Sequence, residues 1–227
     1  MNRTVLRRIG LVLLAVAGGT LLLVAILVAN VDRLTRSTLT YALSAQLGTG
    51  VRLDDVRLGF RDSSLLLRNL VVSNPPGFGP RALLVLPELY VAYDPDAAAS
   101  NRVRFRDVRL HLGELNLEVD AQGRTNVMEL AVHAARSRGL DPERMGTQLL
   151  ESPEFTNRFE GIDRLTLTLG RIAYRDRRNS ARDLDFQLGF TNRTFSHVTS
   201  PVQLMPLVVD ILTRGGSPRV ASPSRAP

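Results

Sequence analysis

The ten residues VRLDDVRLGF at positions 51–60 return in nearly the same form as VRFRDVRLHL at positions 103–112. In both copies apolar residues alternate with polar ones, first at odd positions and then at even ones. Because successive side chains of a strand point to opposite faces of a sheet, this alternation predicts β-structure. The change of parity at the same place in both copies predicts a bulge or bend near Asp55 and Asp107.

Each copy is followed by another alternating segment, so the repeated unit is predicted to be a hairpin. The partner segments are SLLLRNLVVSN at 64–74 and ELNLEVDAQG at 114–123. A third unit, IDRLTLTLGRIAYRD at 162–176, changes parity after Gly170 and is followed by DLDFQLGF at 183–190. The pattern therefore predicts about three hairpins in one sheet.

A further strand is predicted over Ala82–Tyr93, between the first two hairpins. It contains Pro87, which cannot donate a hydrogen bond to a neighbouring strand. Its presence favours an edge position or a bulge for this strand.

Short helices are expected around the sheet, because apolar residues recur there at helical spacing. The first covers about 34–47 and ends at Gly48. The second begins at Asn126, whose spacing from Glu129 is that of a capping box, and ends near residue 138. Two more are expected at about 141–150 and 200–214.

The N-terminal part contains an uncharged apolar run, IGLVLLAVAGGTLLLVAILVA at 9–29. A helix that crosses a bilayer needs roughly 20 such residues, so the run predicts a transmembrane anchor. Arg3, Arg7 and Arg8 precede it, and the positive-inside rule then places the N-terminus in the cytoplasm and exports the rest. A cleaved signal peptide is the competing interpretation, but its apolar core would be shorter.

These segments define the predicted organisation of the chain. Residues 1–31 form a cytoplasmic stub and a signal anchor, residues 32–214 form one exported domain, and residues 215–227 form a disordered tail rich in Ser, Pro and Arg. The predicted fold class is α+β: an N-terminal transmembrane helix followed by a curved, mainly antiparallel β-sheet of repeated hairpins with a few short helices.

The residue types needed for most catalytic sites are missing or scattered. The chain has no cysteine, and its histidines, His111, His133 and His197, show neither zinc-type spacing nor a neighbouring nucleophile motif. The 29 basic residues are all Arg and are interspersed with acids rather than gathered in one block. We therefore expect no enzymatic activity, no catalytic residues, no metal, no cofactor and no nucleic-acid partner.

One face of the predicted sheet is aliphatic and must be covered. Helices could fill it as an ordinary core, or the sheet could curl into a trough whose inside meets acyl chains; alternation alone favours neither. In the trough interpretation the lipid-facing residues are Val56, Leu58, Phe60, Val108, Leu110, Leu112, Leu165, Leu167 and Leu169.

The segment from the anchor to about Leu130 resembles the N-terminal region of AsmA-like proteins. The resemblance rests on an NP-x-GF loop and on a strand pair that ends in G-x-x-N-x-x-x-L. The matching residues are Asn74, Pro75, Gly77, Phe78, Gly123, Asn126 and Leu130.

The resemblance implies a single-pass protein of the bacterial inner membrane whose domain faces the periplasm, related to bridge-like proteins that carry phospholipid. One departure matters, because six to eight strands would make a trough only about 30–40 Å long. A complete bridge across the periplasm is therefore not expected.

Two functions follow as expectations. The first is an anchored, non-enzymatic protein that binds phospholipid or assists its transport in envelope maintenance. The second is a structural or interaction module that recruits another envelope protein. The expected partners are accordingly the membrane, phospholipid and other envelope proteins.

Overall fold

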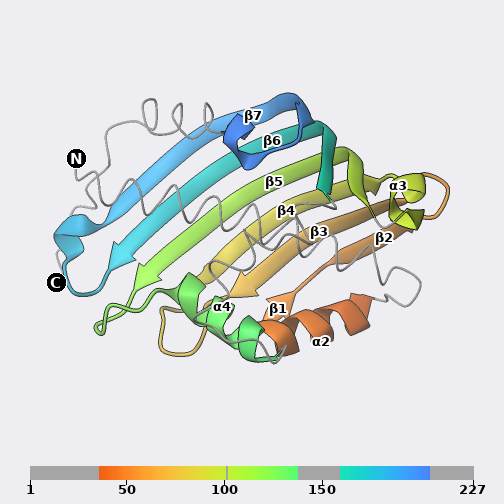
Figure 1. Ribbon diagram of the computed structural model, residues 1–227. Coiled ribbons are helices and arrows are strands. Elements are labelled where there is room, and N and C mark those ends of the chain that lie inside the picture. The colour runs from red at the N-terminus through yellow and green to blue at the C-terminus, as the bar shows by residue number, and fades with distance from the viewer. Residues whose placement is uncertain (1–35, 101, 138–158, 205–227) are drawn as a thin grey trace.

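The described part of the chain is a curved, mixed sheet of seven strands with short helices (Figure 1). The computed structural model describes residues 36–100, 102–137 and 159–204. The strand order is β1-β3-β4-β5-β6-β7, and β2 pairs with β3 beside β1. The strands are β1 (Val51–Arg52), β2 (Asp55–Gly59), β3 (Ser64–Ser73), β4 (Ala82–Tyr93), β5 (Val103–Val119), β6 (Phe159–Asp176) and β7 (Leu184–Val198). The helices are α2 (Arg36–Leu47), α3 (Pro95–Ala99) and α4 (Asn126–Ser137), with 3-10 turns η2 (Ser180–Arg182) and η3 (Pro201–Leu204).

Two of the predicted hairpins are present, and the middle one is wrong. β1 and β2 pair antiparallel with β3, and β6 pairs antiparallel with β7. The residues predicted to form the second hairpin are instead one continuous strand, β5, which pairs in parallel with β6. A parallel pair needs a crossover connection, and α4 lies in the chain between β5 and β6. The sheet is therefore mixed rather than a stack of hairpins.

The predicted changes of parity are confirmed as breaks in the strands. The first separates β1 from β2 at residues 53–54, immediately before Asp55. In the second, Asp107 pairs with Ala92 but Phe105 pairs with Tyr93, so β5 has one extra residue there. Such bulges turn the following side chains to the opposite face.

Several breaks line up across the sheet and form what we call the crease: Asp54, Asn69, Pro87, Gly113 and Gly170. Asn69 has a positive φ of 50° and donates a hydrogen bond to Asp54 (Nδ2 to Oδ2, 3.0 Å). The pairs around it, Arg68 with Glu88 and Leu70 with Leu86, place it opposite Pro87. Pro87 lies inside the sheet, so the predicted edge position is wrong and the predicted irregularity is confirmed.

Two glycines continue the crease from β4 to β6. A Cβ atom on Gly113 would lie 3.1 Å from the Pro87 ring, and one on Gly170 would lie 2.4 Å from the carbonyl oxygen of Gly113. The ladder between β6 and β7 shifts register on both sides of Leu169. Glycine is required at 170 because the two backbones touch there with no space for a side chain.

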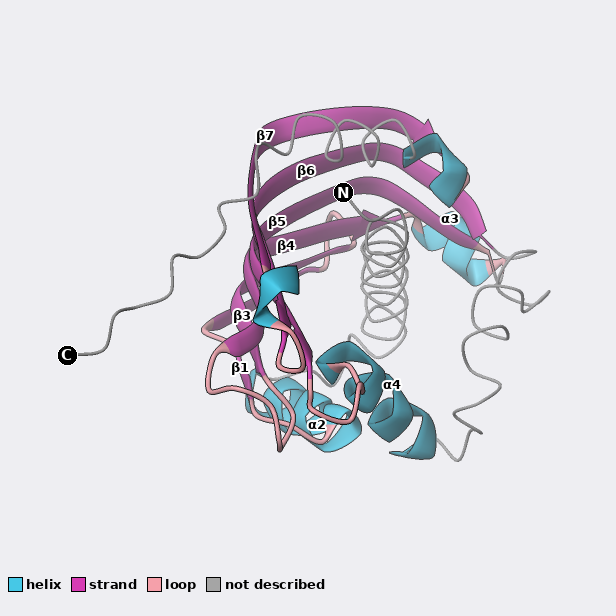
Figure 2. Ribbon diagram, turned by 90° about the vertical axis from the view of Figure 1, so that its left-hand side faces the viewer, coloured by secondary structure: helices cyan, strands magenta, loops and turns pink. Residues whose placement is uncertain are grey.

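Helices α2 and α4 pack on the inner side of the curve, as Figure 2 shows. Leu39 and Leu43 of α2 and Leu130 of α4 belong to the same buried cluster as the strand leucines. We call this side of the sheet the inner face and the opposite side the outer face. Both helices contact the sheet on one side of the crease, α2 at β1 and α4 at the last residues of β5.

The predicted helices at 34–47 and 126–138 are confirmed as α2 and α4 within two residues. Gly48 follows α2 with a φ of 63°, as a helix stop requires. Within residues 36–137 and 159–204, none of the helices has both the length and the apolar character to cross a membrane. The predicted anchor, the helix at 141–150, residues 205–214 and the tail lie outside the described residues.

Gly170→Ala is expected to lower the free energy of unfolding by about 2–3 kcal/mol, because its Cβ would overlap backbone that cannot move aside as a flexible side chain would. Gly50→Ala is the matched control, since its Cβ would meet only the Ser73 side chain, whose hydroxyl lies at 3.2 Å. Urea unfolding of both variants checks this, and equal midpoints would contradict the role of the crease.

Candidate functional site

Aliphatic side chains form continuous rows across the inner face. Residues paired between neighbouring strands share a face, so the register gives each row directly. The first row crosses six strands, from β2 to β7: Leu58, Leu65, Val91, Val108, Leu165 and Phe195. The second row lies beside it: Val56, Leu67, Leu89, Leu110, Leu167 and Arg193.

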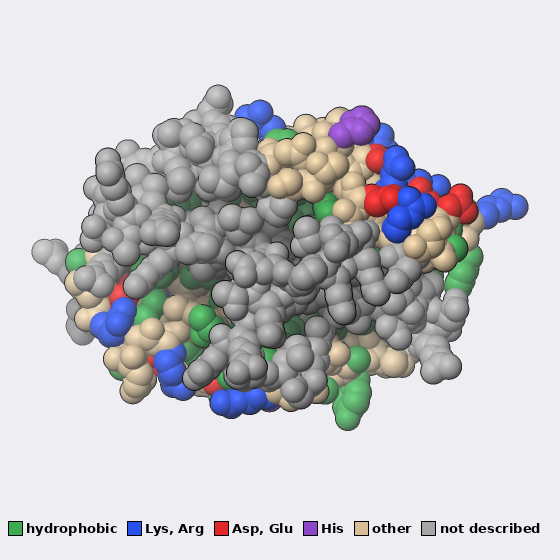
Figure 3. Space-filling view, viewed as in Figure 1, with side chains coloured by type: hydrophobic (Ala, Val, Ile, Leu, Met, Phe, Trp, Pro, Cys, Tyr) green, Lys and Arg blue, Asp and Glu red, His purple; other side chains and the backbone are tan. Residues whose placement is uncertain are grey.

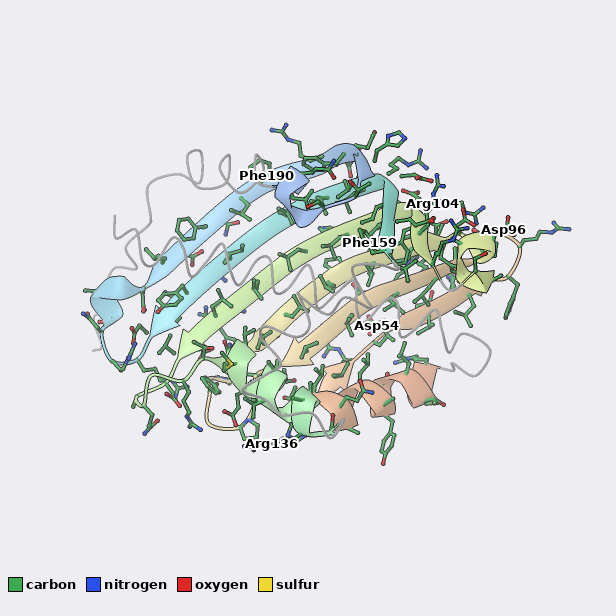
Figure 4. The ribbon with its side chains drawn as sticks, in the orientation of Figure 1. Asp54, Asp96, Arg104, Arg136, Phe159 and Phe190 are labelled. Atoms are coloured by element: carbon green, nitrogen blue, oxygen red, sulfur yellow. The ribbon has the colours of Figure 1, made fainter. Side chains whose placement is uncertain are left out.

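The structure brings together eight of the nine residues predicted to face lipid. Six of them lie in the two rows. The other two, Leu112 and Leu169, pair with each other in a shorter third row. This third row ends at Phe190 of β7, which pairs with Leu169 and is labelled in Figure 4. Phe60 is different, because it lies in the turn after β2 and is 76% exposed.

Most of these inner-face side chains are shielded from solvent. Five of them are 3–6% exposed: Val108, Leu112, Leu165, Leu167 and Leu169. The other three, Val56, Leu58 and Leu110, are half-buried against the same cluster. These rows belong to the same buried cluster as Leu39, Leu43 and Leu130 of the two helices, but α2 and α4 make their main contacts with the sheet on the far side of the crease.

The outer face carries paired charges instead. Arg104 of β5 donates to Asp163 of β6 (Nη2 to Oδ1, 3.0 Å), and Arg164 donates to Asp107 (Nε to Oδ1, 3.2 Å). Arg109 lies over the Tyr90 ring, 4.0 Å from its centroid. The outer face is therefore polar and carries charges of both signs. Figure 3, which looks onto the opposite, inner side, shows basic and acidic side chains side by side at the edge of the molecule near α3.

One outer-face group holds three strands together electrostatically. Arg171 of β6 donates to Asp185 of β7 (Nη2 to Oδ2, 2.5 Å) and to Glu114 of β5. The hydrogen bond from Arg171 lowers the pKa of Asp185, although burial opposes the change, and the positive charges of Arg171 and Arg175 act in the same direction. The pKa of Arg171 is raised, first by its hydrogen bond to Asp185.

Two residues of the family-like motif, Asn74 and Asn126, meet other polar groups in a largely buried network. We call this network the amide cluster: Asn74, Asn116, Glu118, Asn126 and Arg177. Asn126, fully buried, donates to the Asn74 side chain (2.8 Å) and to the carbonyl of Asn116 (2.7 Å). Its own oxygen accepts from the backbone N–H of Glu118 (3.1 Å). Arg177 closes the network with an ion pair to Glu118 (3.4 Å).

The remaining motif residues form the turns around this cluster. The Phe78 N–H donates to the carbonyl of Pro75 (3.3 Å), and the carbonyl of Gly77 accepts from Arg177 (3.0 Å). Gly123 has a φ of 86° in the turn after β5, and its N–H donates to Asp120 (3.1 Å). The motif therefore ties a loop, the end of β5, the start of α4 and the β6–β7 turn into one unit.

Sequence reasoning missed Glu118, Arg177 and Arg193. Glu118 alternates with Leu117 and Val119, so it resembles a solvent-facing strand residue, yet it is 7% exposed. Arg193 falls on the polar side of the simple alternation in 184–198, and a bulge changes its face. The burial of Glu118 and the face of Arg193 cannot be predicted without knowing the partner strands.

The described residues include no group of three or more His, Asp or Glu side chains that could hold a metal ion. Compared with known proteins, the chain matches no family model, no curated protein and no solved structure. The geometry consists of apolar rows on the inner face and a hydrogen-bonded polar end at the amide cluster.

Asn126→Ala is expected to lower the free energy of unfolding by about 2–4 kcal/mol. The substitution removes the partners of three buried polar groups, on Asn74, Asn116 and Glu118, and each unsatisfied group costs free energy. Met128→Ala on the same helix is the control, since Met128 is 61% exposed and its loss should change little. Chemical unfolding of both variants measures the difference.

Asp185→Asn is expected to flatten the acid side of the stability profile. The pKa of Asp185 is lowered in the folded state, so its contribution is present above the ordinary value near 3.9 and is lost as the pH falls below it. Unfolding midpoints of the wild type and the variant between pH 7 and pH 3 should therefore converge at low pH. A constant gap between the two curves would show that Asp185 stabilises the fold without its charge.

Proposed function

We propose that this chain is a non-enzymatic, membrane-anchored protein of the bacterial envelope that binds phospholipid acyl chains on the inner face of its sheet. The observation that carries the proposal is the pair of rows that are aliphatic from β2 to β6 and end at Phe195 and Arg193 of β7. Acyl chains make no hydrogen bonds, so a surface of this kind suits them and offers little to a polar ligand.

The proposed location rests on the sequence. The apolar run at 9–29 anchors the chain in the inner membrane, the three arginines before it keep the N-terminus in the cytoplasm, and the sheet faces the periplasm. The likeness of the segment from the anchor to about Leu130 to AsmA-like proteins supports the same assignment. In this proposal the anchor holds the sheet next to the membrane that supplies the lipid.

The size of the rows limits what the protein does with lipid. Six strands span five spacings, or about 24 Å, whereas one leaflet of the hydrocarbon core is about 15 Å thick. The inner face is thus long enough for one acyl chain and too short to cross the periplasm. We propose that the protein holds or hands over single lipids, or serves as one segment of a larger path.

The proposal requires the inner face to open, because its side chains are shielded from solvent in this structure. The same observation favours the alternative function, an interaction module with a filled core. In that case a partner would pair with β7, the last strand of the described sheet, by strand addition.

Photo-crosslinking in membranes separates the two functions. A photoreactive amino acid at position 110 of the full-length chain is expected to form an adduct with phospholipid, because Leu110 lies at the centre of the second row. The same amino acid at position 111 is the control, since His111 points to the outer face beside Thr168. Mass spectrometry of the purified chain identifies the adduct.

Lipid adducts of equal yield at both positions, or none at position 110, would contradict lipid binding on the inner face. Adducts between position 187 or 193 of β7 and another protein, with no lipid at position 110, would instead support the interaction module.

A further inference from the structure

The two most exposed large hydrophobic side chains of the described residues lie along one edge of the sheet. Tyr41 of α2 is 78% exposed, and Phe60, in the turn after β2, is 76% exposed. Figure 1 shows α2, β1 and β2 together at the edge of the sheet opposite β7. Exposed aromatics are common on protein surfaces, and they indicate a partner only where charge and the path of the chain agree with them.

Tyr41 points away from the core because of its place in the helix. α2 buries Leu39 and Leu43 in the apolar cluster, and Tyr41 lies two residues from each. Two residues correspond to about 200° around an α-helix, so Tyr41 lies on the opposite side of α2. Ala42 and Ala45, which are also exposed, are small, and the tyrosine ring is therefore the most prominent apolar group on this side.

The start of α2 lies between the two aromatics along this edge. The N–H of Val51 donates to the hydroxyl of Ser44 (3.1 Å), and Arg36 Nε donates to the carbonyl of Leu53 (2.7 Å). β1 therefore runs alongside α2 toward the first residue of that helix. β2 follows β1 in the chain and continues past this point to Phe60.

The predicted membrane anchor ends close to the same point. Residues 30–35 join the apolar run at 9–29 to Arg36, and an extended chain of this length reaches about 25 Å at most. Tyr41 lies about 8 Å along the helix from Arg36, and Phe60 lies about 20 Å along the strand in the other direction. The anchor therefore keeps both aromatics within reach of the bilayer surface.

The edge also carries positive charge. Arg52 of β1 and Arg61, which follows Phe60, are exposed, and neither forms an ion pair with another residue in the part of the chain that the structure describes. Residues 36–73 contain five arginines and three aspartates, an excess of two positive charges. Anionic headgroups attract arginine side chains that lie near a membrane surface.

We propose that Tyr41, Phe60, Arg52 and Arg61 form a surface that docks on the headgroup region of an anionic phospholipid bilayer. A tyrosine suits this region because its ring is apolar and its hydroxyl is polar, and a guanidinium binds lipid phosphate. The inference rests on the anchor of the proposed function and goes beyond it, since it identifies the edge of the sheet that meets the membrane.

This orientation gives the two rows an entrance. Val56 and Leu58 of β2 are the first residues of the rows, and β2 lies at the docking edge. Both side chains are half-buried rather than fully buried. A lipid that leaves the bilayer meets these two residues first and reaches Leu110 afterwards.

Tryptophan fluorescence tests the docking surface, because the chain contains no tryptophan of its own. Tyr41→Trp and Phe60→Trp probe the edge, and Thr191→Trp is the matched control, since Thr191 is exposed on β7 at the opposite edge. The full-length variants are reconstituted in vesicles of phosphatidylglycerol and phosphatidylcholine, with bromine on the acyl chains near the headgroup. Tryptophan at positions 41 and 60 should lose fluorescence to the brominated lipid and be protected from acrylamide in the water, and tryptophan at position 191 should show the reverse.

The charge of the edge is tested in the Phe60→Trp background. Arg61→Gln should lower the ratio of docked to undocked protein about fivefold, the effect of one arginine at an anionic surface, and added salt should act in the same direction. Arg164→Gln is the control, because Arg164 lies on the outer face of β6 and pairs with Asp107. It should leave the quenching unchanged.

The outcomes separate docking from the function on which it rests. Equal quenching at all three positions, or none at 41 and 60, would overturn the docking surface. Protection from acrylamide without quenching by the lipid would overturn it too, because a protein such as a second copy of this chain would then cover the edge. Quenching at 41 and 60 with no lipid adduct at position 110 would support docking and end the lipid-binding function; an adduct without that quenching would end docking alone.

Discussion

The contact between the backbones of Gly113 and Gly170 is the constraint on which the shape of this protein depends. It lets two parallel strands touch and bend together, and Pro87 and Asn69 continue the bend across β4 and β3. Each strand changes the face of its apolar residues at this crease, so an almost unbroken aliphatic surface stays on the inner side although the strands turn.

The crease also divides the inner face into a part that α2 and α4 contact and a part that carries the two rows. On one side α2 and α4 cover the sheet, and the amide cluster fixes the start of α4 against the end of β5. Burying Glu118 there is tolerated because Asn74, Gly79 and Arg177 all donate to its carboxylate. The two rows lie on the other side of the crease from the amide cluster. They are the basis of the proposed lipid-binding function.

The charge pairs of the outer face lie on the opposite side of the sheet from the two rows. On the outer face arginines pair with carboxylates of the neighbouring strand, as Arg104 with Asp163 and Arg171 with Asp185, so each of these positive charges has a negative partner. Arg193 lies on the inner face instead, because its strand carries an extra residue.

The sequence by itself determined the local elements: the strands at 64–73 and 82–93, helices α2 and α4, and a change of face near Asp55, Asp107 and Gly170. These follow from side-chain periodicity and from glycine and capping residues, which act over a few positions. Only the tertiary structure decided that residues 103–119 form one strand, that β6 runs parallel to it, that Arg193 faces inward and that Glu118 is buried. Alternation records which residues share a face of their own strand, but the partner strand and the register decide which face becomes the inside.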